Sequence, residues 1–178
     1  MTDLATIDTH AVLTEPTTLR IQRLLPGPAE RVWGYLVKSD LRRKWLASGE
    51  MPQQVGGKVE LVWRNDELTT PSGKRPDGFP EEHRMEVQVT EIDPPRKLAI
   101  TWGSTGGVSF ELKSLGDQVL LTIVHQRIAD PDTRLNISAG WHMHLDLLVA
   151  SINGKPLPSP FWDVWSRLRE DYQRRMQG

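Results

Sequence analysis

The stretch GWHMHLDLL at residues 140–148 places His142, His144 and Asp146 at every second position. On a β-strand these three side chains would share one face and could converge on a metal ion. On an α-helix His142 and Asp146 lie one turn apart, whereas His144 points elsewhere. The secondary structure around the stretch therefore decides between a metal site and an ordinary helix.

The surrounding pattern favours a helix over residues 138–152, which ends at Asn153-Gly154 in a usual way. Three ligands then cannot converge, and we expect no metal. Only His142 and Asp146 can meet, while His142 and His144 lie at the two margins of the apolar stripe, solvated or hydrogen-bonded. The stripe consists of Trp141, Leu145, Leu148, Val149 and Ile152.

Composition excludes several other classes of protein. The 178 residues carry a formal net charge of −1, which provides no bulk attraction to nucleic acid or to an anionic membrane. The absence of cysteine removes disulfides and thiolate chemistry and fits a reducing compartment. No apolar run approaches the roughly 20 residues that span a bilayer, and the N-terminus lacks a signal-peptide pattern. We expect a cytoplasmic protein with no membrane or nucleic-acid partner and no cofactor.

Alternating apolar residues before the helix predict a run of antiparallel strands. A first strand begins near Leu19, and two short helices within residues 28–46 follow it. Pro28 suits a helix start, and Ser39 could cap the second helix. Further strands are expected around residues 59–63, 83–89, 98–102, 108–112 and 119–125, with a long loop at 65–82.

This order of elements predicts the α+β class. A strongly curved antiparallel sheet of few strands needs a long helix to fill its concave face. We therefore expect a flexible arm at residues 1–16, a helix-grip domain at 17–153, and a proline-rich link with an extra helix at 154–178. Incomplete contact between sheet and helix would leave a cavity.

Four segments resemble the SRPBCC domain family, in the branch related to the activator of the heat-shock-protein-90 ATPase. They are LLPGPAERVW at 24–33, LRRKWL at 41–46, VTEIDPPRKLAITW at 89–102, and Gly140-Trp141 with the leucines that follow. The wider superfamily includes START and birch-pollen-allergen-like domains. The resemblance implies a helix-grip fold with a hydrophobic pocket between sheet and long helix. No single catalytic motif unites the family, so no catalytic residue is assigned.

We expect the ligand contacts to come from inward-facing residues. The aromatic residues could equally be core packing, and His83 and His125, each near a strand end, could simply reach water. The expected ligand-binding set is Trp45, Trp63, His83, Met85, Trp102, Phe110, His125, Trp141, His144, Leu145 and Leu148.

Two classes of function remain open from the sequence. The first is binding of a small hydrophobic or aromatic molecule in the cavity. The second is a cyclase- or hydrolase-like enzyme that uses His83 or His125 as acid or base. A chaperone-associated interaction module is a weaker alternative. We favour binding.

The last segment predicts a helix over residues 160–176. Phe161, Trp165 and Leu168 form an apolar stripe that we expect to cover Met143 and Leu147, within the chain or across a homodimer. Packing on the sheet edge is the alternative. The basic residues at 42–44 and near the C-terminus are expected on solvated faces, because neither group has the interleaved aromatic residues of a nucleic-acid site.

Overall fold

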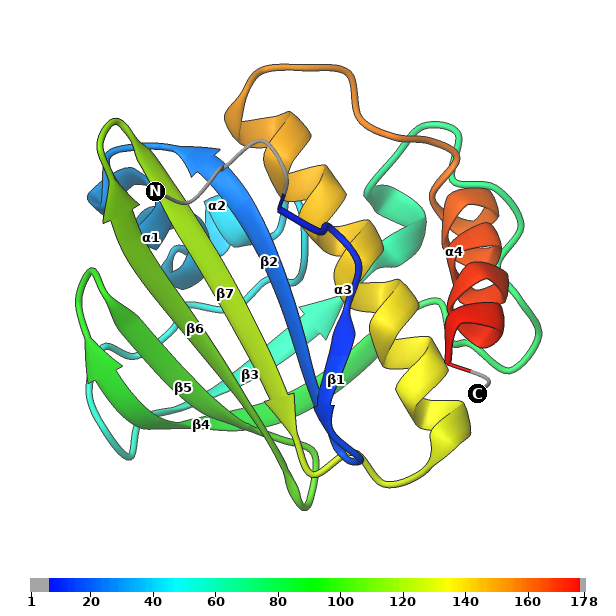
Figure 1. Ribbon diagram of the computed structural model, residues 1–178, viewed down its shortest axis with the longest axis horizontal. Coiled ribbons are helices and arrows are strands. Elements are labelled where there is room, and N and C mark those ends of the chain that lie inside the picture. The colour runs from blue at the N-terminus through cyan, green and yellow to red at the C-terminus, as the bar shows by residue number, and fades with distance from the viewer. Residues whose placement is uncertain (1–6, 177–178) are drawn as a thin grey trace.

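A computed structural model describes residues 7–176, which form a seven-stranded sheet and the helices that pack on it (Figure 1). Each strand pairs antiparallel with its neighbours, in the order β1-β2-β7-β6-β5-β4-β3. The predicted α+β helix-grip fold is confirmed. The strands are β1 Val12–Glu15, β2 Thr18–Pro26, β3 Lys58–Trp63, β4 His83–Asp93, β5 Lys97–Trp102, β6 Gly106–Leu115 and β7 Gln118–Gln126.

The inner face of the sheet follows the alternation in the sequence. In β7 the buried residues are Val119, Leu121, Ile123 and His125, and their neighbours are less buried. This period of two places one face on the core. A register shift between Val89 and Glu91 interrupts the β4–β5 pairing. Irregularities of this kind bend a strand, which suits the curved sheet seen in Figure 1.

The long helix α3, Pro131–Ile152, lies across the concave face of the sheet (Figure 1). It begins seven residues earlier than the predicted start at residue 138, because Asp130 caps it and Pro131 occupies the first turn. The Asp130 carboxylate accepts a hydrogen bond from Thr133 N at 2.8 Å. The Asp-Pro pair resembled a turn in the sequence, but it is also a common helix start.

Two short helices, α1 Ala29–Val37 and α2 Ser39–Arg42, follow β2. Ser39 does not cap α2; it lies inside the helix, and its hydroxyl accepts from Gly49 N at 2.8 Å. Arg42 is also not solvated. It is 2% exposed and donates to the carbonyls of Leu36, Ala47 and Gly49. Its guanidinium therefore holds together the turn that leads from α2 to β3.

The N-terminal segment is more ordered than the predicted flexible arm. Residues 12–15 form the edge strand β1, which pairs with β2 through Val12 opposite Arg20. Residues 1–6 of that arm lie outside the described residues. Residues 12–15 read Val-Leu-Thr-Glu and do not alternate between apolar and polar, so no period-two pattern marks a strand there.

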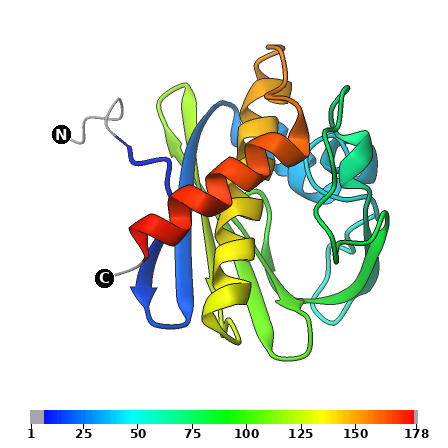
Figure 2. The ribbon, with the colours of Figure 1, turned by 90° about the vertical axis from the view of Figure 1, so that its right-hand side faces the viewer.

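The C-terminal helix α4, Phe161–Arg175, crosses the outer face of α3 (Figure 2). Met143 and Leu147, on the side of α3 away from the sheet, are fully buried. Helix α4 of the same chain therefore covers α3, as expected, and does not pack on the sheet edge. A homodimer stays a prediction. Among residues 7–176, none of the helices combines the length and apolarity needed to cross a bilayer.

Candidate ligand-binding site

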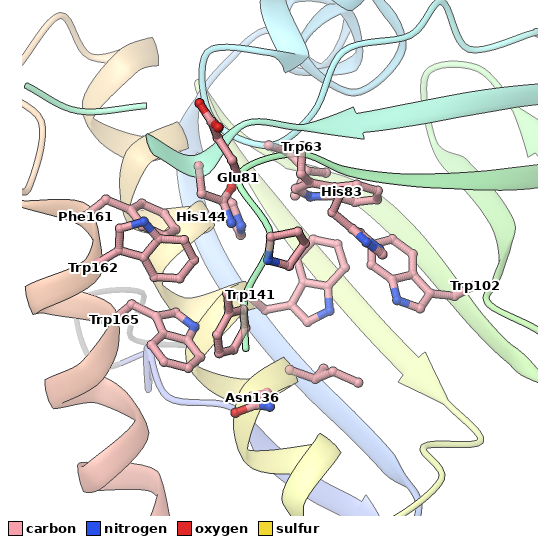
Figure 3. A pocket seen from close by; sticks show the side chains of 16 residues that line it. Trp63, Glu81, His83, Trp102, Asn136, Trp141, His144, Phe161, Trp162 and Trp165 are labelled. Atoms are coloured by element: carbon pink, nitrogen blue, oxygen red, sulfur yellow. The ribbon is translucent and has the colours of Figure 1, made fainter. Parts of the chain in front are cut away.

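A cavity of about 370 Å³ lies between α3, the first turn of α4, and the ends of β3, β4 and β5 (Figure 3). The loop between β3 and β4, which includes the short 3-10 helix η2 Asn65–Glu67, closes another side. The volume is at the lower end of the range of about 300–1,000 Å³ typical of small-molecule sites. Its aromatic lining consists of Trp63, Phe79, Trp102, Trp141, Phe161, Trp162 and Trp165.

The aromatic rings form two groups on opposite sides of the cavity. Figure 3 shows Trp63 and Trp102 on one side and Trp162 and Trp165 on the other, with Trp141 between them. Trp102 lies 5.5 Å from Trp63 and 5.4 Å from Trp141, measured between ring centroids. On the opposite side the Trp162 and Trp165 rings are 5.7 Å apart. A flat apolar molecule between the two groups would contact ring surfaces on both sides.

Hydrogen bonds fix the helix side of the cavity to the β3–β4 loop. Trp162 Nε1 donates to Asp66 Oδ1 at 2.7 Å, and Phe161 N donates to Thr69 Oγ1 at 2.9 Å. Asp66 also pairs with Arg75 of the same loop. The loop and the start of α4 therefore form one connected wall.

His144 is the most buried polar residue on the cavity wall, at 6% exposure. Its Nδ1 lies 2.7 Å from the carbonyl oxygen of Trp45. Because a carbonyl can only accept, Nδ1 carries the hydrogen. Burial lowers the pKa of His144 to about 4, so the ring is neutral near pH 7.

His125 has a different position, behind the wall. Its Nδ1 accepts a hydrogen bond from Trp141 Nε1 at 3.0 Å, and the side chain does not line the cavity. Burial lowers its pKa to about 4. His125 therefore orients the Trp141 ring and is neither solvated at a strand end nor available to a molecule in the cavity.

A sequence model of the Activator of Hsp90 ATPase homolog 1-like proteins matches residues 26–153. The chain belongs to this family. The match ends just after α3, so α4 and three of the seven aromatic lining residues lie beyond the family's shared segment. The resemblance to the SRPBCC fold found in the sequence is confirmed.

Solved structures support the same assignment of the family domain. A Bordetella parapertussis protein of known solution structure is 35% identical, with a TM-score of 0.78 over 100% of this chain and 97% of that one. CalU16 from Micromonospora echinospora is 21% identical, with a TM-score of 0.66 over 90% and 89% of the two chains. DynU16, from the dynemicin biosynthetic locus, is 16% identical, with a TM-score of 0.63 over 82% and 51%. The last two show a shared fold alone. No curated protein matches the chain.

Of the eleven residues expected at the site of this family domain, five line the cavity: Trp63, His83, Trp102, Trp141 and His144. Their contact with a ligand stays a prediction. The other six do not line it. They are Trp45, Met85, Phe110, His125, Leu145 and Leu148.

Four of the six are held in the core by packing, and His125 lies behind the wall. Trp45 is fully buried, and its Nε1 donates to the carbonyl of Tyr35. Leu145 and Leu148 are both 0% exposed and fill the core within the sheet–helix layer. Phe110 packs behind Trp141, at 5.9 Å between ring centroids. The helix fills most of the concave face, so the free space is displaced toward the β3–β4 loop and α4.

Sequence reasoning missed the lining residues contributed by that loop and by α4. Phe161 and Trp165 were expected to cover α3, Trp162 was assigned no role, and Phe79 lies in a segment without periodicity. The dense aromatic run FWDVW at 161–165 was the available signal. The lining residues outside the expected set are Leu46, Asn65, Phe79, Pro80, Glu81, Asn136, Ile137, Gly140, Phe161, Trp162 and Trp165.

The two remaining polar residues of the opening stretch form a separate network. Asp146 accepts a hydrogen bond from Arg23 Nη2 at 3.0 Å, and its other oxygen lies 3.5 Å from His142 Nε2. His142 Nδ1 is 2.7 Å from the Tyr172 hydroxyl, which links α3 to α4. Burial of His142 lowers its pKa. His142 and His144 are therefore hydrogen-bonded and not solvated, which is one of the two alternatives expected from the sequence. Asp146 forms an ion pair with Arg23.

We expect Asp146→Asn to lower the free energy of unfolding by about 3 kcal/mol, because it leaves the Arg23 charge buried without its counter-ion. The matched control is Asp132→Asn, on the same helix. Asp132 pairs with Arg169 but is 80% exposed, so its loss should cost at most about 1 kcal/mol. Urea unfolding at pH 7 compares the two variants. Equal losses would contradict a special role for the Arg23–Asp146 pair.

Proposed function

We propose that this family domain binds a small hydrophobic, aromatic molecule in the cavity between α3, α4 and the β3–β4 loop. The observation that carries the proposal is a cavity bordered on opposite sides by two groups of aromatic rings. Apolar rings that border an empty volume lose the contacts that a packed core would give them. An aromatic ligand would restore those contacts.

The polar groups of the cavity are few, as in most small-molecule sites. His83 and Glu81 are exposed and border the cavity, whereas His144 is buried in its wall. Such an arrangement leaves the apolar surface to supply affinity and a small number of polar atoms to set orientation. The ligand would be mainly apolar, with a polar end.

The alternative of an enzyme depends on a histidine that can reach the substrate. His125 cannot serve, since Trp141 occupies its Nδ1 and separates it from the cavity. His83 borders the cavity next to Trp63, at 5.5 Å between ring centroids. Within residues 7–176, His83 forms no hydrogen bond that would orient its ring as an acid or base. Binding is therefore the function that the geometry supports best.

Gly140 offers a direct test of cavity binding. It lies on the wall, and a Cβ atom placed on it would meet no atom within 4 Å. We expect Gly140→Phe to fill the cavity and to abolish binding of the neutral fluorescent dye N-phenyl-1-naphthylamine, measured by its emission and by tryptophan quenching.

The matched control is Gly140→Ala, which adds one methyl group at the same helical position. It should keep dye binding and raise the free energy of unfolding by about 1 kcal/mol, because alanine loses less backbone entropy than glycine in a helix. Wild-type binding that persists in folded Gly140→Phe would show that the dye binds elsewhere. Absence of binding to the wild-type protein would remove support for the proposed function.

A further inference from the structure

The polar atom that the cavity offers to a ligand is a specific one. His144 Nδ1 donates to the Trp45 carbonyl, so the other ring nitrogen, Nε2, carries a lone pair. Within the part of the chain that the structure describes, Nε2 has no hydrogen-bond partner. The ring belongs to the cavity wall and is more than nine-tenths buried.

The tautomer is fixed by the backbone, not by solvent. Trp45 is fully buried, and its carbonyl belongs to the turn after α2. Arg42 stabilises this turn by donating to the carbonyls of Leu36, Ala47 and Gly49. A reversed tautomer would place two acceptors against each other at 2.7 Å. Near pH 7, His144 therefore presents an acceptor to the cavity.

A second acceptor supports the same conclusion. Asn65, a residue of the β3–β4 loop that also lines the cavity, has a buried side-chain oxygen, Oδ1, without a partner among the described residues. Unpaired buried acceptors cost free energy, and a ligand donor would recover it.

The charges around the cavity select against anions. Among the described lining residues, Glu81 is the single side chain with a formal charge near pH 7, and it is exposed. None of the lining residues within 7–176 is a lysine or arginine that could neutralise a carboxylate or phosphate. A buried anion without a counter-charge is strongly disfavoured.

We infer that the ligand is a neutral aromatic molecule with a hydrogen-bond donor, such as a phenolic hydroxyl, that donates to His144 Nε2. This inference rests on the proposed function and narrows its ligand class. The aromatic rings would enclose the apolar part of the ligand. His144, the second histidine of the H-x-H-x-D stretch in α3, would accept the hydrogen bond from the polar end of the ligand.

The test uses three probes of similar shape: 2-naphthol, naphthalene and 2-methoxynaphthalene. The first has a donor, and the other two do not. We expect the wild-type protein to bind 2-naphthol about tenfold more tightly than either of the others, the effect of about one good hydrogen bond. Titration calorimetry or tryptophan quenching at pH 7 measures the three dissociation constants.

His144→Asn is the informative variant, because the asparagine amide can still donate to the Trp45 carbonyl while the Nε2 acceptor is lost. The tenfold preference for 2-naphthol should collapse, and the affinity for naphthalene should change little. Arg167→Ala, at an exposed position of α4 that does not line the cavity, is the control and should keep the preference.

A measurement on the wild-type protein tests the same hydrogen bond even if the His144→Asn variant does not fold. The ¹⁵N resonance of His144 Nε2 should move when 2-naphthol is added and should stay in place when 2-methoxynaphthalene is added. Equal affinities for the three probes, or a preference that survives in His144→Asn, would overturn the inference and leave the binding function intact. If none of the probes binds, both the function and the inference fail.

Discussion

Deletion of residues 158–178 is expected to unfold the domain. The deleted segment carries four buried aromatic residues of α4: Phe161, Trp162, Trp165 and Tyr172. Loss of one large buried side chain costs about 3–5 kcal/mol, and a typical domain has a total stability of only about 5–15 kcal/mol. The loss of the helix therefore exceeds what the remaining fold can compensate.

The deletion would also uncover surfaces that α4 protects. Met143 and Leu147 on α3 are fully buried beneath the second layer of helix. The Tyr172 hydroxyl accepts from Ala11 N at 2.6 Å, so the N-terminal segment would lose an anchor as well. Circular dichroism should show no cooperative melting transition, and a hydrophobic dye should bind the truncated chain nonspecifically.

Two point variants on α4 separate this effect from a general effect of truncation. Trp165→Ala should lower the free energy of unfolding by about 3–5 kcal/mol, because Trp165 is buried and packs on Phe79 at 5.1 Å between ring centroids. Arg167→Ala, at an exposed position of the same helix, should change it by less than about 1 kcal/mol. A truncated chain with an unchanged melting temperature would show that α4 is a docking element for a partner and not part of the core.

The fold followed from the sequence because its pattern is repeated in many residues. Five strands each keep one parity inward, and Val119, Leu121 and Ile123 of β7 show that parity in the structure. The register of α3 was likewise set by several apolar residues, from Trp141 to Ile152. Where four or five positions share one burial pattern, a single exceptional residue does not change the predicted element.

Features that depend on one residue or on tertiary contacts did not follow. Arg42 looked like part of a solvated basic run, and only the fold shows three carbonyls around its guanidinium. Burial lowers its pKa to about 10, a cost that those carbonyls partly offset. A sequence gives the charge of such a residue but not the partners that the chain brings to it.

The site was predicted only in part for a related reason. Parity identified Trp63 and Trp102, which project from regular strands, but it could not say how far α3 fills the concave face. The residues that enclose the remaining space come from the β3–β4 loop and α4, where Phe79 and Trp162 meet at 5.5 Å between ring centroids. Contacts between segments without shared periodicity are set by the tertiary structure alone.

Acidification is expected to destabilise the protein well before its carboxylates titrate. His125, His142 and His144 are each buried in the neutral form. Burial lowers the pKa of His125 and of His144 from 6.5 to about 4, and it lowers that of His142 against the opposing effect of Asp146. Unfolding releases all three rings to water, where their pKa returns to about 6.5.

The direction of the effect follows from proton binding. Between pH 6.5 and 4 the unfolded chain binds protons that the folded chain does not, so stability falls as the pH falls through this window. Each of His125 and His144 contributes about 3 kcal/mol to the loss by pH 4, about 6 kcal/mol together, and His142 adds to it in the same direction. Above pH 7 these histidines make no difference, because they are neutral in both states.

Urea unfolding at several values between pH 7.5 and pH 4.5 tests this expectation. His144→Asn removes one of the titrating rings but can retain the hydrogen bond to the Trp45 carbonyl, so its stability should depend on pH less steeply, by about 3 kcal/mol over the window. Arg167→Ala, at an exposed position of α4, changes no histidine and should leave the wild-type dependence in place. A free energy of unfolding that stays constant from pH 7 to pH 4.5 would mean that the buried rings accept protons without leaving the core. That result would require water to reach His144 from the cavity, because the carbonyl of Trp45 can accept only the proton on Nδ1 and a charged ring needs a second acceptor at Nε2.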